Sequence, residues 1–186
     1  MAEKPILFSA PMVNAIHGGR KTMTRRVASG ALWTAPDGNL KFIDKRGIRP
    51  LGDACPYGKP GDTLWVRETF AVNCVGGQDF LFYRADSYPD GDGAKWKPNI
   101  FMPRKYSRIP RKYSRITLRI TDVRVERLQD IGEADAKAEG MGAWYDTKDG
   151  TVYRPEFQIL WDRINGSRGF GWAVNPYVWV VSFEKI

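Results

Sequence analysis

Residues 19–26 carry the densest mixture of side chains that could do chemistry. They read Gly-Arg-Lys-Thr-Met-Thr-Arg-Arg, so hydroxyl groups lie among cations. A lysine acts as a base only when it is partly neutral, and both burial and nearby positive charge lower its pKa. The arginines around Lys21 would supply such charge. Composition alone favours a solvated basic strand edge, where cations discourage edge-to-edge pairing.

A second basic feature lies between Arg104 and Arg119. Seven basic residues and no acidic residue fall in this stretch, so nearly all of the formal net charge of +8 comes from it. Such a charge favours an anionic partner. The hexapeptide Arg-Lys-Tyr-Ser-Arg-Ile occurs twice, at 104–109 and 111–116. It indicates either a local duplication that lengthens a loop, or an extended arm that contacts phosphates and offers tyrosines for base stacking.

The composition excludes several classes of protein. The 186 residues are 42% hydrophobic and 27% charged, which suits one globular domain rather than a disordered chain. No stretch reaches the roughly 18 apolar residues of a membrane span, and the N-terminus lacks a signal-peptide pattern. We therefore expect a cytoplasmic protein with no membrane partner. Cys55, Cys74 and His17 match the spacing of no closed zinc site, so we expect neither a metal nor another cofactor.

Local patterns predict the elements that position residues 19–26. A strand is expected at 6–8, then a short helix at 11–16 that begins after Ser9 and ends at Gly18-Gly19, then a strand at 21–27. Further strands are predicted at 63–70, 80–83, 116–125 and 177–183, a hairpin turn at Asp37-Gly38, and helices at 130–139 and 155–164. Short helices among about six strands predict an α+β protein, built on a small, mostly antiparallel sheet or barrel. We expect one domain over 1–186, with a basic loop insertion around 86–115.

Residues three apart on a regular strand face opposite sides, so Lys21 and Thr24 would diverge there. They can cooperate only if Lys21 lies in the turn before the strand, or if a bulge separates them. The glycines at 18 and 19 make the turn plausible.

Three motifs, taken in order, resemble the ASCH domain family. They are residues 19–26 after a short helix, the Pro-Gly-Asp turn at 60–62 leading into Leu-Trp-Val-Arg-Glu, and the final Tyr-Val-Trp-Val-Val-Ser-Phe. The resemblance spans Lys4 to Ile186 and looks closest to the longer ASCH-domain proteins of bacteriophages and prophages. It implies a small β-barrel related to the PUA fold, with flanking short helices, long loop insertions and a cleft for RNA or a nucleoside. It also implies a bacterial or phage-infected cell. The repeated loop departs from the family pattern, which has a single copy.

At the Lys-Thr element the chain also resembles small bacterial amidohydrolases that act on N4-acetylcytidine. This resemblance implies catalytic roles for Lys21, Thr24 and, through Ala-Glu-Gly-Met at 138–141, Glu139. Hydrolysis of an N-acyl cytosine requires a nucleophile, a group that takes its proton, and a donor to the oxyanion. Thr24 would act as the nucleophile or orient a water, with Glu139 carrying protons, although a charged residue at a helix end is commonly just exposed. The residues expected to bind substrate or RNA are Arg20, Thr22, Arg25, Arg26, Arg67, Glu68, Arg104, Lys105, Arg111 and Lys112.

Two alternatives stay open beside a hydrolase of modified cytidine. One is a non-catalytic, PUA-like RNA-binding module. The other is a metal-independent ribonuclease, in which Lys21 and the arginines stabilise a charged phosphorane. Fold-level kinship does not choose among these, because related folds host several functions. In each case the expected partner is RNA or a nucleoside, and the expected oligomeric state is a monomer.

Overall fold

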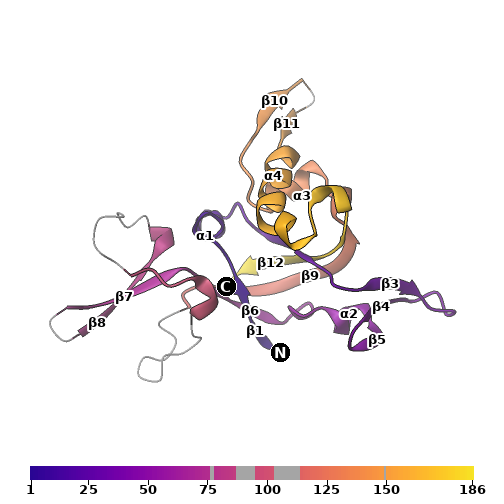
Figure 1. Cartoon of the computed structure of the whole chain (residues 1–186), viewed down its shortest axis with the longest axis horizontal. Helices are drawn as coiled ribbons and strands as arrows, with labels where there is room; N and C mark the ends of the chain where they lie inside the picture. The colour runs from indigo at the N-terminus through magenta and orange to yellow at the C-terminus, as the bar shows by residue number, and fades with distance from the viewer. Residues whose placement is uncertain (76–77, 87–94, 103–113, 149) are drawn as a thin grey trace.

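A five-stranded sheet lies at the centre of the protein (Figure 1). The computed structural model describes residues 1–75, 78–86, 95–102, 114–148 and 150–186. The strand order is β1 (Glu3–Leu7), β6 (Thr63–Arg67), β9 (Thr117–Arg127), β12 (Tyr177–Lys185) and β2 (Met23–Val27). β1 runs parallel to β6, and the other neighbours are antiparallel. The sheet is therefore mixed, with β1 and β2 at its two edges.

Smaller sheets and helices surround the central sheet. In the described residues they are β3 (Ala31–Thr34), β4 (Leu40–Asp44), β5 (Gly47–Pro50), β7 (Phe70–Val75), β8 (Gln78–Tyr83), β10 (Tyr145–Thr147), β11 (Gly150–Val152), α1 (Ala10–His17), α2 (Leu51–Ala54), α3 (Glu133–Ala138) and α4 (Arg154–Asn165). The β3–β5 and β7–β8 sheets extend to opposite sides of the central sheet, and the β10–β11 hairpin projects beyond α3 and α4 (Figure 1). None of the described helices is long and apolar enough to cross a membrane.

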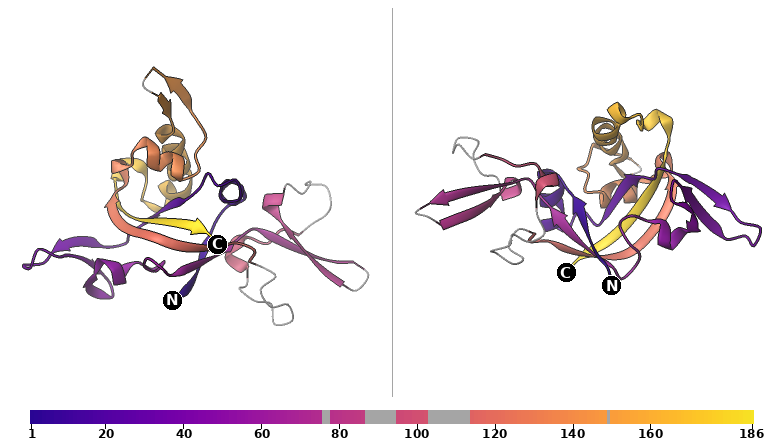
Figure 2. Two further views of the ribbon diagram at one scale, coloured as in Figure 1. Left: turned by 180° about the vertical axis from the view of Figure 1, so that it is seen from behind. Right: turned by 60° about the horizontal axis from the view of Figure 1, so that its bottom comes forward.

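The apolar sequence of β12 reflects burial on both faces of the sheet. Alternate residues of a strand point to opposite sides. Trp179 and Val181 pack into a cluster with residues from β1, β6 and β9, whereas Val178 and Val180 pack beneath α3 and α4. Each of these four side chains is at most 2% exposed. β9 and β12 curve together under the two helices (Figure 2).

The described strands form an open sheet, and closure into a barrel is not found among them. The two edge strands are nevertheless joined by a side chain. The guanidinium of Arg26, on β2, donates a hydrogen bond of 2.6 Å to the carbonyl of Leu7, on β1. The mixed α+β class is as predicted, and the closed barrel stays a prediction.

Most predicted elements are present, and the helix predicted at 130–139 is shorter than expected. Only its first residue, Asp130, falls in a separate 3-10 turn, Leu128–Asp130, where the Asp130 carboxylate accepts a hydrogen bond from the backbone N–H of Arg127. The α-helix itself begins only after Gly132. Much of the predicted basic insertion around 86–115 lies outside the described residues.

Candidate functional site

Two helix ends bring Lys21 and Glu139 together. α1 ends with Gly19 at a positive φ of 70°, and α3 ends with Gly140 at a positive φ of 88°. In both cases the N–H of the glycine and the N–H of the residue after it donate back to carbonyls near the end of the helix, which is the Schellman arrangement favoured by glycine. The chain after α1 then pairs with the end of α3, because the N–H of Thr22 donates to the carbonyl of Ala138 at 2.9 Å. Lys21 lies before β2, which begins at Met23. Cooperation between Lys21 and Thr24 requires this position, because the two side chains would diverge on a regular strand.

Lys21 is buried and makes three hydrogen bonds. Its Nζ donates at 2.8 Å to the Oε2 of Glu139, to the carbonyl of Glu139 and to the carbonyl of Met23. Its side chain is fully buried, and its Nζ lies 5.4 Å from the centre of the Phe8 ring. Burial lowers the pKa of Lys21, and the Glu139 carboxylate opposes that shift. All three N–H bonds of the ammonium are thus used inside the protein.

One oxygen of the Glu139 carboxylate is bonded to Lys21, and the other has no hydrogen-bond partner among the described residues. Oε2 accepts from Lys21, whereas Oε1 has no hydrogen-bond partner among the described residues although it is buried. The nearest cation to Oε1 is the Nη1 of Arg25, at 3.5 Å. A buried carboxylate oxygen is a strong acceptor, so an unfilled position on it favours a ligand or a water.

Glu139 lines a cavity of about 450 Å³ between the start of α1 and α4. We call this the α1–α4 cavity. Its wall is mostly apolar, and its polar side chains are Ser9, Glu139, Glu156 and Arg163. Ser9 stands at the N-cap position of α1 but makes no side-chain capping bond. The cavity therefore combines an apolar surface with two carboxylates, one hydroxyl and one guanidinium.

Arg25 ties the site to the sheet through a charge network. Its side chain is fully buried, and its Nη2 lies 2.5 Å from the Oε1 of Glu126 and 2.6 Å from the Oδ2 of Asp135. Arg124 contacts the same two carboxylates, at 3.0 and 2.6 Å. The network joins β2, β9 and α3, and fixes the end of α3 that carries Glu139.

The other predicted catalytic residue, Thr24, is buried on β2 opposite Val181, and it does not line the α1–α4 cavity. Among the predicted binding residues, Arg20 and Thr22 are exposed, whereas Arg25 is engaged with three carboxylates. Arg26 stacks over the Phe8 ring at 5.3 Å. A role for each in binding stays a prediction.

Glu68 belongs to a different group of charges. It is 1% exposed, and its two carboxylate oxygens accept from Arg115 at 3.0 and 2.9 Å. Arg115 also binds Asp86 and lies 4.0 Å from the centre of the Tyr83 ring. No hydrogen bond or ion pair links this group to Lys21 or Glu139 within the described residues. The neighbouring Arg67 donates to the carbonyl of Ile100.

The remaining predicted binding residues, Arg104, Lys105, Arg111 and Lys112, lie outside the described residues. The described part of the chain contains no cluster of three or more His, Cys, Asp or Glu side chains arranged to hold a metal.

Sequence reasoning missed Glu156 and Arg163, two charged residues of α4 that line the α1–α4 cavity. The helical period was the available signal, since positions 156, 160 and 163 share one face of α4.

No protein-family model matches this chain, and no curated protein matches it significantly. Two solved structures are similar. One is an ASCH domain from Lactobacillus crispatus JV V101, with 14% identity and a TM-score of 0.45, covering 99% of this chain and 79% of the other. The second is a DUF984 protein from Enterococcus faecalis V583, with 14% identity and a TM-score of 0.44, covering 100% of this chain and 80% of the other. The first belongs to the family that the sequence motifs resemble.

Proposed function

We propose that the protein hydrolyses an N-acylated cytidine, with the pyrimidine bound in the α1–α4 cavity. The observation that carries this proposal is the carboxylate of Glu139, a residue that lines the cavity: one of its oxygens is fixed by Lys21, and the second is buried without a hydrogen bond among the described residues. The motif resemblance to amidohydrolases of N4-acetylcytidine supports the same residues.

The cavity suits a flat, partly polar ligand. Its volume of about 450 Å³ lies within the range of small-molecule sites, roughly 300–1,000 Å³. Met12, Met141 and Leu160 offer apolar surface to a ring. Carboxylates accept hydrogen bonds from exocyclic N–H groups, and a guanidinium donates to a ring carbonyl. Glu139, Glu156 and Arg163 therefore match the edge of a cytosine.

The reaction needs a base that faces the acyl group, and Glu139 is the best candidate. Its free oxygen takes a proton from a water, whose oxygen attacks the acyl carbon. The bond between that carbon and the exocyclic nitrogen then breaks, and Glu139 returns the proton to the nitrogen. The products are cytidine and a carboxylic acid. Such proton transfers typically contribute 10²–10⁴-fold to the rate.

Lys21 serves this reaction as a positioning residue. Its ammonium holds Oε2 of Glu139 and the carbonyl of the same residue, so the carboxylate has one orientation. Lys21 does not line the cavity, whereas Glu139 does. Glu139 is therefore the better candidate for the base that takes the first proton.

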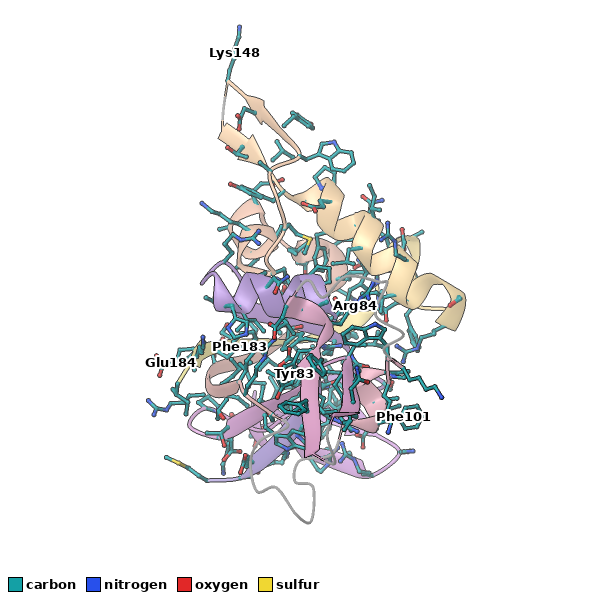
Figure 3. The ribbon with its side chains drawn as sticks, turned by 90° about the vertical axis from the view of Figure 1, so that its left-hand side faces the viewer. Tyr83, Arg84, Phe101, Lys148, Phe183 and Glu184 are labelled. Atoms are coloured by element: carbon teal, nitrogen blue, oxygen red, sulfur yellow. The ribbon has the colours of Figure 1, made fainter. Side chains whose placement is uncertain are left out.

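The test is incubation with N4-acetylcytidine, following cytidine and acetate by chromatography. Glu139→Gln should lower kcat by about 10²–10⁴-fold, since the amide still accepts from Lys21 but cannot take a proton. Lys21→Ala should abolish turnover, and Lys21→Met, which keeps the volume of the side chain, should reduce kcat far more than it changes KM. Glu184→Gln, an exposed carboxylate on β12, is the matched control (Figure 3). Full activity of Glu139→Gln in a folded protein would refute the proposal.

A non-catalytic RNA-binding module is the second candidate, favoured by the exposed cations beside the site, such as Arg20. It predicts RNA binding that weakens steeply with salt and no product from N4-acetylcytidine. The ribonuclease alternative has less support, because the ammonium of Lys21 has no N–H left for a phosphorane.

A further inference from the structure

A second cavity, of about 570 Å³, lies on the other side of the segment that carries Glu139. We call it the α3 cavity. It is lined by the end of α1, by one face of α3 and by the chain that follows, including Arg20, Lys137, Met141, Gly142 and Tyr153. Several lining residues are glycine or alanine, which leaves room for a bulky group between the longer side chains.

The two cavities share a wall. Met141 lines both of them. Gly142 lines the α3 cavity, and a side chain added at Gly142 would lie 3.2 Å from the Oε2 of Glu156, which lines the α1–α4 cavity. Glu139 and Gly142 are three peptide units apart, so they are separated by at most about 11 Å. The two cavities therefore lie within about the length of one nucleotide of each other.

The α3 cavity is lined by two cations, Arg20 and Lys137, both of which are exposed. Within the described residues, neither Arg20 nor Lys137 has a carboxylate partner, and no acidic side chain lines the cavity. Lys21, Arg25 and Arg115, by contrast, all pair with carboxylates. The Nζ of Lys137 lies 5.7 Å from the centre of the Tyr153 ring, a contact that leaves its N–H bonds available to an anion.

From this charge and adjacency we propose that the α3 cavity is a phosphate subsite for the molecule whose base occupies the α1–α4 cavity. The substrate class is then a nucleoside 5′-phosphate rather than a free nucleoside. This inference rests on the proposed occupancy of the α1–α4 cavity by a pyrimidine. The guanidinium of Arg20 can bind two phosphate oxygens at once, and the ammonium of Lys137 adds a point charge.

The experiment compares cytidine with cytidine 5′-monophosphate by isothermal titration calorimetry. These product-like probes undergo no hydrolysis, so binding is measured without turnover. Wild type should bind the monophosphate at least about tenfold more tightly, because a hydrogen bond to a charged group contributes about that factor. Arg20→Gln and Lys137→Gln should each remove about tenfold of the affinity for the monophosphate and leave the affinity for cytidine unchanged. Lys148→Gln, at the tip of the β10–β11 hairpin, is the control with the same loss of charge (Figure 3).

The outcomes distinguish failure of the subsite from failure of the proposed function. Equal affinities for the two probes overturn the phosphate subsite alone, whereas no binding of either probe overturns both the subsite and the proposed occupancy of the α1–α4 cavity. A preference for the monophosphate that survives in the Arg20→Gln/Lys137→Gln double variant also overturns it, since the phosphate then binds elsewhere. A preference that depends on both cations supports the subsite even if N4-acetylcytidine is not hydrolysed, and in that case only the proposed reaction fails.

Discussion

Replacing Gly140 by alanine tests the geometry that brings Glu139 to Lys21. Gly140 has a φ of +88°, and a Cβ built there would lie 3.0 Å from the Cβ of Ala15 and 3.0 Å from the Cβ of Lys21. The left-handed backbone costs an alanine about 1–2 kcal/mol, and overpacking a tight site costs about 1–3 kcal/mol. The two effects together should lower the free energy of unfolding by about 2–5 kcal/mol.

Two further glycines separate the contributions. Gly61 has a φ of +90° with nothing within 4 Å of its built Cβ, so Gly61→Ala should cost only the backbone strain of about 1–2 kcal/mol. Gly166 has a φ of −58° and open space, so Gly166→Ala should be close to neutral. Urea denaturation followed by circular dichroism measures all three. If Gly140→Ala lowers the free energy of unfolding no more than Gly61→Ala does, then Ala15 and Lys21 do not pack closely against Gly140. If the destabilised variant keeps full hydrolase activity, the position of Glu139 does not matter to the reaction.

Two other predictions concern buried groups. Arg115→Ala should destabilise the protein by about 3–5 kcal/mol, because it leaves the Glu68 carboxylate, which is 1% exposed, without its cation. Arg119→Ala breaks a half-exposed ion pair with Glu184, so it should cost at most about 1 kcal/mol in the same urea titration. Similar values for the two variants would contradict the burial of Glu68. Burial also raises the pKa of the Cys55 thiol, so the folded state holds this proton more tightly than the unfolded state does. The stability gained from this group is present below the ordinary thiol pKa of about 8.5 and is lost as the pH rises through the higher folded value. In a Cys74→Ser background, a thiol reagent at pH 8 should accordingly react slowly with the native protein and rapidly in urea, and equal rates would refute the burial.

The local part of this structure could be predicted from sequence. Pro11 and the glycines at 18 and 19 bracket α1, and the apolar, β-branched run at 177–183 predicts β12, because these signals depend on neighbours in the chain. Placing Lys21 before its strand follows from the same glycines. α3 begins three residues later than the pattern predicts, because Asp130 belongs to the preceding 3-10 turn and Gly132 is the N-cap of the helix.

The contacts that build the site could not be read in this way. Arg25 meets Glu126 and Asp135 across 101 and 110 residues, and no local pattern encodes such a pairing. The α1–α4 cavity depends on how α4 packs, which periodicity alone does not determine. Glu139 was found only through a four-residue resemblance to a known family, and its neighbours Glu156 and Arg163 carried no comparable motif.

The charge network around Arg25 has a consequence for how this sequence can change over time. Arg25, Arg124, Glu126 and Asp135 share partners, so losing one member unbalances the charge of the group, and the cost is greatest around Arg25, whose side chain is fully buried. Neutral drift at one of these positions is therefore blocked until another changes with it. In relatives of this protein the four positions should vary as a set, and an exchange of Arg25 for a neutral residue should coincide with the disappearance of an acid on β9 or α3.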